Sequence, residues 1–185
     1  KNLKMKCCGS GVVLKKSKLG TRFFSHSRRG ECITASESAE HLLAKDLIAR
    51  AVQSIEWEAL TEEAGISPDG QKWVADVLAI LGAKKIAFEV QWSPQSTEET
   101  RRRQNVYKNS RVRGLWLMRQ LSLPISREVP AFRLRIDEEK KSFDVLIPSN
   151  SYAYFFINQR TKDESWHWQH VIPLNQFVRG ALTGK

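Results

Sequence analysis

The sequence predicts an α/β protein in which helices flank a mixed β-sheet. Two helical segments, residues 34–52 and 97–109, enclose three strand-like segments, and a further strand-like segment, residues 112–118, follows the second helix. Apolar residues recur with helical spacing in the first helix, whereas β-branched and aromatic runs bounded by turns are typical of strands. Positive charge is also unevenly distributed, in a chain of 185 residues with a net charge of +10.

Residues 1–33 are expected to form a small basic hairpin unit. Two short apolar runs, residues 12–14 and 22–24, are separated by a turn that contains Gly20. Four potential zinc ligands occur in this unit: Cys7, Cys8, His26 and Cys32. Adjacent cysteines are poorly placed to share one tetrahedral ion, so no structural zinc is expected.

Residues 34–52 predict the first helix of the core. Thr34 or Ser36 can cap its start, and Glu37 falls in its first turn. The apolar stripe consists of Leu42, Leu43, Leu47 and Ile48. Residues spaced four apart share a different face, and these are Glu37, His41 and Lys45.

Three strands are predicted next, over residues 54–58, 73–81 and 85–92. Residues 67–70 (SPDG) are a turn sequence between the first two strands. Residues 82–84 (GAK) join the second and third strands, which is consistent with a hairpin.

The second helix and the fourth strand complete the predicted core. Ser96 or Thr97 can cap the helix over residues 97–109. The acidic pair Glu98-Glu99 is typical of a helix start, because acidic side chains interact favourably with the positive amino-terminal end of the helix dipole. Residues 112–118 (VRGLWLM) are typical of a buried strand.

The remainder of the chain is expected to be a β-rich extension. Its strand-like segments cover residues 132–136, 143–147 and 152–157. A short closing helix is predicted over residues 173–182, ended by Gly184. The predicted units are therefore a hairpin unit, a core and an extension, over residues 1–33, 34–120 and 121–185.

Positive charge is concentrated in two windows. Residues 1–30 contain nine Lys and Arg residues, residues 101–113 contain six, and neither window contains Asp or Glu. This segregation favours a polyanionic partner such as DNA, with RNA as an alternative partner and an ordinary basic surface as the alternative interpretation. The candidates for contact with nucleic acid are Lys15, Lys16, Arg22, Arg101, Arg102, Arg103, Tyr107 and Lys108.

Two carboxylates in apolar, strand-like runs predict a metal site. Asp76 and Glu89 lie on the two strands of the predicted hairpin, and an isolated buried carboxylate is costly unless a charge meets it. Hard cations such as Mg²⁺, or Mn²⁺ in its place, bind carboxylate and carbonyl oxygens, so the Val90 carbonyl is a further candidate ligand. Gln91 shares the face of Glu89 and could orient a water. The alternative is that both carboxylates lie on an edge strand and face solvent.

The polar face of the first helix offers further site residues. Glu37 could complete the metal shell from behind the strands, and Glu40 is a competing choice. His41 could act as a ligand, a proton relay or a phosphate contact. The alternative is an ordinary solvated helix face.

The location of the protein is predicted from its cysteines and from its apolar segments. Three cysteines and no visible signal sequence predict reduced thiols in a cytoplasmic protein. No apolar run of membrane-spanning length occurs in the sequence, so no membrane association is expected.

An ordered set of short motifs resembles the competence protein CoiA-like family of the PD-(D/E)XK nuclease superfamily. The resemblance covers roughly residues 20–120, with a weaker match over residues 172–180. The motifs are FSH at 24–26, ESAEHL at 37–42 with Lys45, ADV at 75–77, FEVQWS at 88–93, RxxxY at 103–107 and GLWL at 114–117.

This resemblance implies a restriction-endonuclease-like core with Asp76 and Glu89 as metal-binding acids. Glu37 would be the helix carboxylate beside His41, and the helix with Arg103 and Tyr107 would face the substrate. The sequence departs from the superfamily pattern twice, since Ala75 replaces a proline and Gln91 replaces a lysine. The second change removes a positive charge that a second metal, His41 or Arg103 could supply instead.

The predicted activity is Mg²⁺- or Mn²⁺-dependent hydrolysis of DNA phosphodiester bonds, in competence, recombination or the processing of foreign DNA. The catalytic candidates are Asp76, Glu89, Gln91, Glu37 and His41. A nucleic-acid-binding module that keeps the nuclease fold without its activity is the main alternative, and a protein-interaction domain with incidental charge is a weaker one.

Overall fold

The computed structural model describes residues 3–5, 8–27, 37–119, 128–148 and 168–184. The strands in this part of the chain are β1 (Val12–Lys16), β2 (Arg22–His26), β3 (Glu58–Ile66), β4 (Lys72–Leu81), β5 (Lys84–Gln91), β6 (Arg113–Met118), β7 (Ala131–Asp137), β8 (Ser142–Pro148) and β9 (Trp168–Pro173). The helices are α1 (Ala39–Gln53), α2 (Thr97–Asn109) and α4 (Leu174–Thr183). The α/β class predicted from the sequence is confirmed.

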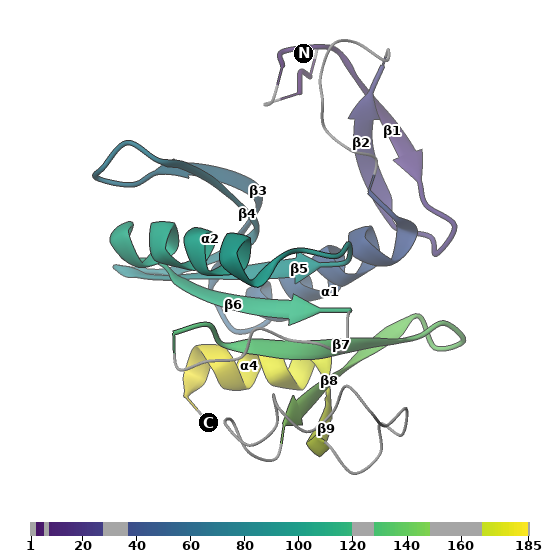
Figure 1. The fold of residues 1–185 in the computed structure, drawn as a ribbon. Helices are drawn as coiled ribbons and strands as arrows, with labels where there is room; N and C mark the ends of the chain where they lie inside the picture. The colour runs from purple at the N-terminus through teal and green to yellow at the C-terminus, as the bar shows by residue number, and fades with distance from the viewer. Residues whose placement is uncertain (1–2, 6–7, 28–36, 120–127, 149–167, 185) are drawn as a thin grey trace.

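The main sheet is mixed. Among the described residues, seven strands form it in the order β3-β4-β5-β6-β7-β8-β9, while β1 and β2 pair separately as a hairpin (Figure 1). The β5–β6 and β6–β7 pairs are parallel, and the other pairs are antiparallel. The helix α2 connects β5 to its parallel neighbour β6. The sheet therefore extends beyond the four strands predicted for the core, because β7 continues it at the β6 edge.

Two apolar layers cover the two faces of the sheet. The α1 and α4 side packs against Val77, Phe88 and Leu117, whereas the α2 side includes Tyr107 packed with Trp116. Along β5, side chains alternate between the layers, so Glu89 and Gln91 lie on the α2 side.

The start of α1 differs from its predicted position. The N-cap is Ser38, whose side chain accepts a hydrogen bond from the His41 backbone N–H at 3.2 Å. Thr34 and Ser36, the predicted caps, lie outside the described residues. For α2 the predicted cap is confirmed, since Ser96 accepts from the Glu99 N–H at 3.2 Å.

The first predicted strand of the core, residues 54–58, is wrong. Residues 54–56 form a turn after α1, and β3 begins only at Glu58. The strand β3 lies at the edge of the sheet, where several polar side chains remain exposed to solvent. Its sequence therefore lacks the apolar run that predicts a strand.

Most of the other strands and the closing helix agree with their predicted positions, but β9 was not predicted. The β4–β5 hairpin, the strands β6, β7 and β8 and the helix α4 are confirmed, and Gly184 ends α4 in a left-handed conformation with φ of 74°. The predicted strand over residues 152–157 lies outside the described residues. No helix in the described residues has the length and apolar content needed to cross a membrane.

Candidate metal and catalytic site

Asp76 lies where β4 departs from regular strand geometry. Ala75 packs in the α2 layer and Val77 in the α1 layer, although residues two apart in a strand normally share a face. The β4–β5 pairing ends at Val77 and Phe88, just before Asp76 would oppose Glu89. This irregularity turns the Asp76 side chain away from its regular direction and toward α1.

The backbone of β5 stabilises Asp76 beyond the last paired residues. The Val90 N–H donates to Asp76 Oδ2 at 2.7 Å. A carboxylate oxygen thus takes the place of the carbonyl that would continue the ladder. The interaction fixes the Asp76 carboxylate beside the backbone of Val90, whose carbonyl the sequence predicts as a metal ligand.

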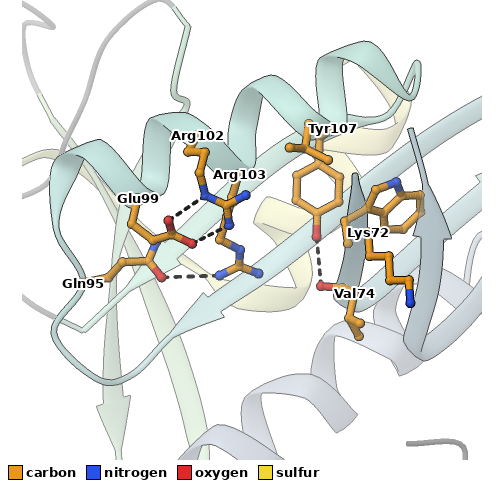
Figure 2. A pocket seen from close by; sticks show the side chains of 9 residues that line it. Lys72, Val74, Gln95, Glu99, Arg102, Arg103 and Tyr107 are labelled. Carbon is orange, nitrogen blue, oxygen red and sulfur yellow. Dashed lines mark hydrogen bonds and ion pairs between the residues drawn. The ribbon is translucent and has the colours of Figure 1, made fainter. Parts of the chain in front are cut away.

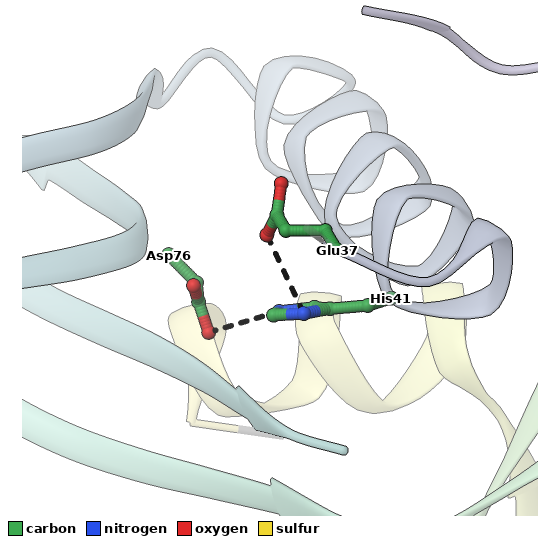
Figure 3. A group of neighbouring side chains, drawn as sticks. All are labelled: Glu37, His41 and Asp76. Atoms are coloured by element: carbon green, nitrogen blue, oxygen red, sulfur yellow. Dashed lines mark hydrogen bonds and ion pairs between the residues drawn. The ribbon is translucent and has the colours of Figure 1, made fainter. Parts of the chain in front are cut away.

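Three predicted site residues come together on the α1 side of the sheet. Single ligand atoms of Glu37, His41 and Asp76 all lie within 4.8 Å of one another. His41 stands between the two acids, with Nδ1 3.4 Å from Glu37 Oε1 and Nε2 3.4 Å from Asp76 Oδ2 (Figure 3). Glu40, the competing choice, does not belong to this group among the described residues. The group offers two carboxylates and one imidazole, which are suitable ligands for Mg²⁺ or Mn²⁺.

Lys45 lies within this acidic group. The sequence places it on the same face as His41 but does not predict its burial or its contacts with three acids. Its side chain is only 7% exposed, and its Nζ donates to Glu37 Oε1 at 2.6 Å and to Glu62 of β3. The same Nζ lies 3.9 Å from Asp76 Oδ1. Glu62 reaches Lys45 from a backbone with φ of 52°, a conformation that is uncommon for a residue other than glycine.

The charges of Asp76 and Lys45 stabilise each other. Burial on its own would raise the pKa of Asp76, but His41, the Lys45 ammonium and the Val90 N–H together hold that pKa below its usual value. Burial likewise opposes the charge of Lys45, yet Glu37, Asp76 and Glu62 raise the pKa of this lysine. Both shifts favour the charged forms, so a negative Asp76 and a positive Lys45 lie side by side in this group.

Glu89 has different partners, on the α2 side of the sheet. It is 2% exposed, with Oε2 2.5 Å from Arg103 Nη2 and Oε1 in contact with the Tyr107 hydroxyl. The Tyr107 hydroxyl also lies 3.1 Å from the Val74 carbonyl oxygen. Glu89 is outside the 4.8 Å ligand group of the described residues. The predicted substrate-facing pair Arg103 and Tyr107 thus holds Glu89 in place.

The environment of Glu89 favours its protonated form. Burial, and next the charge of Asp76, raise its pKa to about 7, although Arg103 and Tyr107 oppose this shift. The one proton of the Tyr107 hydroxyl cannot serve both Glu89 and Val74 at once. A protonated Glu89 can instead donate to Tyr107 while Tyr107 donates to Val74. Glu89 is therefore poised to change its charge near neutral pH.

The other predicted site residues are closer to solvent. Gln91 is partly exposed, and its side-chain amide donates to the Ser93 carbonyl at 2.6 Å. The candidate nucleic-acid contacts with exposed side chains are Lys15, Lys16, Arg22, Arg101, Arg102 and Lys108. Arg102 forms two hydrogen bonds with Glu99, at 2.7 and 2.8 Å.

Of the four possible zinc ligands in the amino-terminal unit, Cys7 and Cys32 lie outside the described residues.

The family of the chain follows from a match over most of its length. The family model for the competence protein CoiA nuclease-like domain matches residues 37–180, which include α1, the β4–β5 hairpin, α2 and α4. The chain belongs to the CoiA nuclease-like family. The resemblance seen in the sequence motifs is thus confirmed, and the residues described above lie within the matched nuclease-like domain.

Other comparisons add less than the CoiA match. No curated protein matches the chain. One similar solved structure is that of a protein of unknown function, AF1548, at 13% identity and a TM-score of 0.33. The alignment covers 53% of this chain and 52% of that protein, so it spans only about half of either.

Proposed function

We propose that this CoiA-family protein is a metal-dependent nuclease that hydrolyses phosphodiester bonds of DNA in competence, recombination or the processing of foreign DNA. The observation that carries the proposal is the placement of Asp76 at a break in the sheet, within 4.8 Å of ligand atoms of Glu37 and His41. The order of a two-acid hairpin, a helix and a parallel strand further supports a PD-(D/E)XK type of core.

The described residues fit a divalent cation. Asp76 and Glu37 provide carboxylate oxygens, His41 provides an imidazole nitrogen, and Glu89 with the Val90 carbonyl would approach from β5. Lys45 already places a positive charge among these acids. When bound, the ion would supply an activated water and stabilise negative charge on the phosphate.

Protein side chains would supply the remaining chemistry. Gln91 is neutral, and its amide is engaged by Ser93. The Lys45 ammonium lies 3.9 Å from Asp76 Oδ1, and Lys45 is our candidate for the charge that stabilises the reacting phosphate. His41 lies between two carboxylates, and the alternative to its role as a ligand is that it accepts a proton and passes it on.

The direct test is nicking of supercoiled plasmid by the purified chain. We expect conversion to open circles with Mn²⁺ or Mg²⁺, and no conversion when EDTA removes the metal, because the ion generates the nucleophile. Nicking that persists in EDTA after removal of contaminating nucleases would contradict metal dependence.

The second candidate function is DNA binding without cleavage. Gln91 favours it, because it lacks the positive charge of the usual lysine. The contacts of Lys45 with Glu37 and Asp76, and of Arg103 with Glu89, also favour it, because these acids already have partners within the protein. Under this alternative the protein binds DNA and never nicks it in any divalent ion. Binding and nicking must therefore be measured on the same preparation.

The salt dependence of binding tests the contribution of the helix α2. Arg101 and Lys108 are exposed on this helix, so we expect the variant R101Q/K108Q to lower the slope of log affinity against log salt by roughly 1.5 to 2. Fluorescence anisotropy of labelled DNA between 50 and 200 mM NaCl, as an order-of-magnitude range, measures this slope. The control is K84A/K85A on the β4–β5 hairpin. An unchanged slope in R101Q/K108Q would remove α2 from the DNA interface.

A further inference from the structure

A cavity of about 340 Å³ opens between the first residues of β4 and the helix α2. Lys72, Trp73 and Val74 line it from β4, while Arg102, Arg103 and Tyr107 line it from α2 (Figure 2). Its volume lies at the lower end of the range of pockets that hold small organic ligands. It is distinct from the group of Glu37, His41 and Asp76, which lies on the α1 side of the sheet.

The wall from β4 presents a fixed aromatic ring. The Trp73 indole N–H donates to Ser110 Oγ at 2.8 Å, and its ring meets Tyr107 edge to face with centroids 5.3 Å apart. The indole also covers Gly65, where a Cβ atom would come within 2.1 Å of a Trp73 ring carbon. The ring is therefore held in one orientation although Trp73 is only partly buried. Beside it, the Val74 residue is 48% exposed.

The charge of the lining complements a phosphate. Lys72, Arg102 and Arg103 are basic, and Glu99 is the acidic residue among those that line the cavity. Arg102 is already paired with Glu99 and Arg103 with Glu89, whereas Lys72 is exposed at the start of β4. An aromatic ring beside a basic side chain is the combination that binds a nucleotide of single-stranded DNA by stacking and charge.

The cavity adjoins the Glu89 side of the proposed catalytic site. Arg103 and Tyr107 line the cavity and contact the two oxygens of Glu89. A DNA strand with its phosphate near Asp76 and Glu89 would therefore have a neighbouring nucleotide within reach of Trp73.

We propose that this cavity binds one unpaired nucleotide of the DNA substrate, with its base on Trp73 and its phosphate near Lys72. The proposal rests on the proposed function and deepens it by naming the substrate class. A base must leave its pair to stack on a protein ring, so the preferred substrate is single-stranded DNA or DNA with a frayed or single-stranded segment.

Binding of labelled oligo(dT) by the full chain in EDTA tests the proposal without requiring cleavage. We expect W73L to weaken binding by roughly 5- to 150-fold, as loss of base stacking does. W73F, which keeps a ring, should stay within a few-fold of wild type. K72A should weaken binding and lower the salt slope by about 0.7, the share of one phosphate contact. The matched lysine control is K84A at the start of β5, which should bind like the wild type.

An oligonucleotide with abasic sites tests base stacking with the wild-type protein, so the proposal can still be tested if W73L unfolds. The wild type should bind the abasic strand as weakly as W73L binds oligo(dT), and W73L should lose little more on the abasic strand. Equal binding of oligo(dT) by wild type and W73L, or equal weakening on a closed duplex without free ends, would overturn the proposal. Plasmid nicking in Mn²⁺ is measured separately. Nicking without Trp73-dependent binding would reject the nucleotide-binding role of the cavity and leave the proposed nuclease activity intact. Trp73-dependent binding without nicking rejects catalysis and leaves the cavity as a binding site.

Discussion

Replacement of Asp76 with Asn is expected to reduce Mn²⁺-dependent nicking by about 10³-fold or more, because the charge that holds the cation is lost. The amide oxygen of Asn can still accept the Val90 N–H, which Asp76 accepts at 2.7 Å. The break in the β4–β5 pairing should therefore be retained, and thermal unfolding should confirm a folded protein. Rates of plasmid relaxation in Mn²⁺ measure the effect.

Asp46 provides the matched control for this substitution. It lies on α1, where it pairs with Arg50 at 3.0 Å and is not part of the acidic group around Lys45. Because surface ion pairs contribute little, D46N should nick plasmid like the wild type and unfold at nearly the same temperature. If D76N nicks as fast as D46N, Asp76 does not hold a catalytic ion and the nuclease proposal fails.

The pH dependence of stability should show the unusual ionisation of Glu89. Its pKa is raised to about 7 in the folded protein, so the folded state binds this proton more tightly than the unfolded chain does. The free energy of unfolding should therefore fall as pH rises from about 4.5 to about 7, by roughly 3 kcal/mol in total. Below this range Glu89 is protonated in both the folded and the unfolded state. Above it Glu89 is ionised in both states, so its contribution to the free energy of unfolding no longer changes with pH.

The variant E89Q isolates this contribution, because Gln does not titrate. Urea unfolding in EDTA at several pH values should show the wild type losing stability relative to E89Q across that interval. Asp76 has the opposite shift, so the stability that it contributes is lost only as pH falls through its lowered pKa. Parallel pH profiles for wild type and E89Q would mean that Glu89 has an ordinary pKa.

In the nuclease proposal the proton on Glu89 competes with the metal ion, so Mn²⁺ affinity should rise with pH up to about 7.

The elements that hold the site were largely predictable from local sequence. The caps and charges of α2 and the apolar runs of β4 and β5 are local signals, and the structure has these elements where they were predicted. The face shared by His41 and Lys45 also follows from helix geometry, whereas Glu37 precedes the Ser38 N-cap and is not in the first turn of α1 as predicted. These signals depend only on residues a few positions apart.

The features that were missed depend on contacts between distant segments. Glu62 lies in a polar stretch of an edge strand and reaches Lys45 only because its backbone has a positive φ. The addition of β7 beside β6 depends on parallel pairing of separate segments. The side-chain direction of Asp76 depends on an irregularity that strand periodicity does not predict. One sequence signal did point to the acidic group: Lys45 is a lysine next to the apolar residue Ala44. If Lys45 is buried, its charge requires nearby acids.

Anomalous diffraction from crystals soaked in Mn²⁺ tests the central claim most directly. The proposal predicts a peak at coordination distance from Asp76, with Glu89 as a further ligand released from Arg103 or Tyr107. A peak bound without Glu89, or no peak while Lys45 stays within 3.9 Å of Asp76, would contradict the claim that both acids share one catalytic cation.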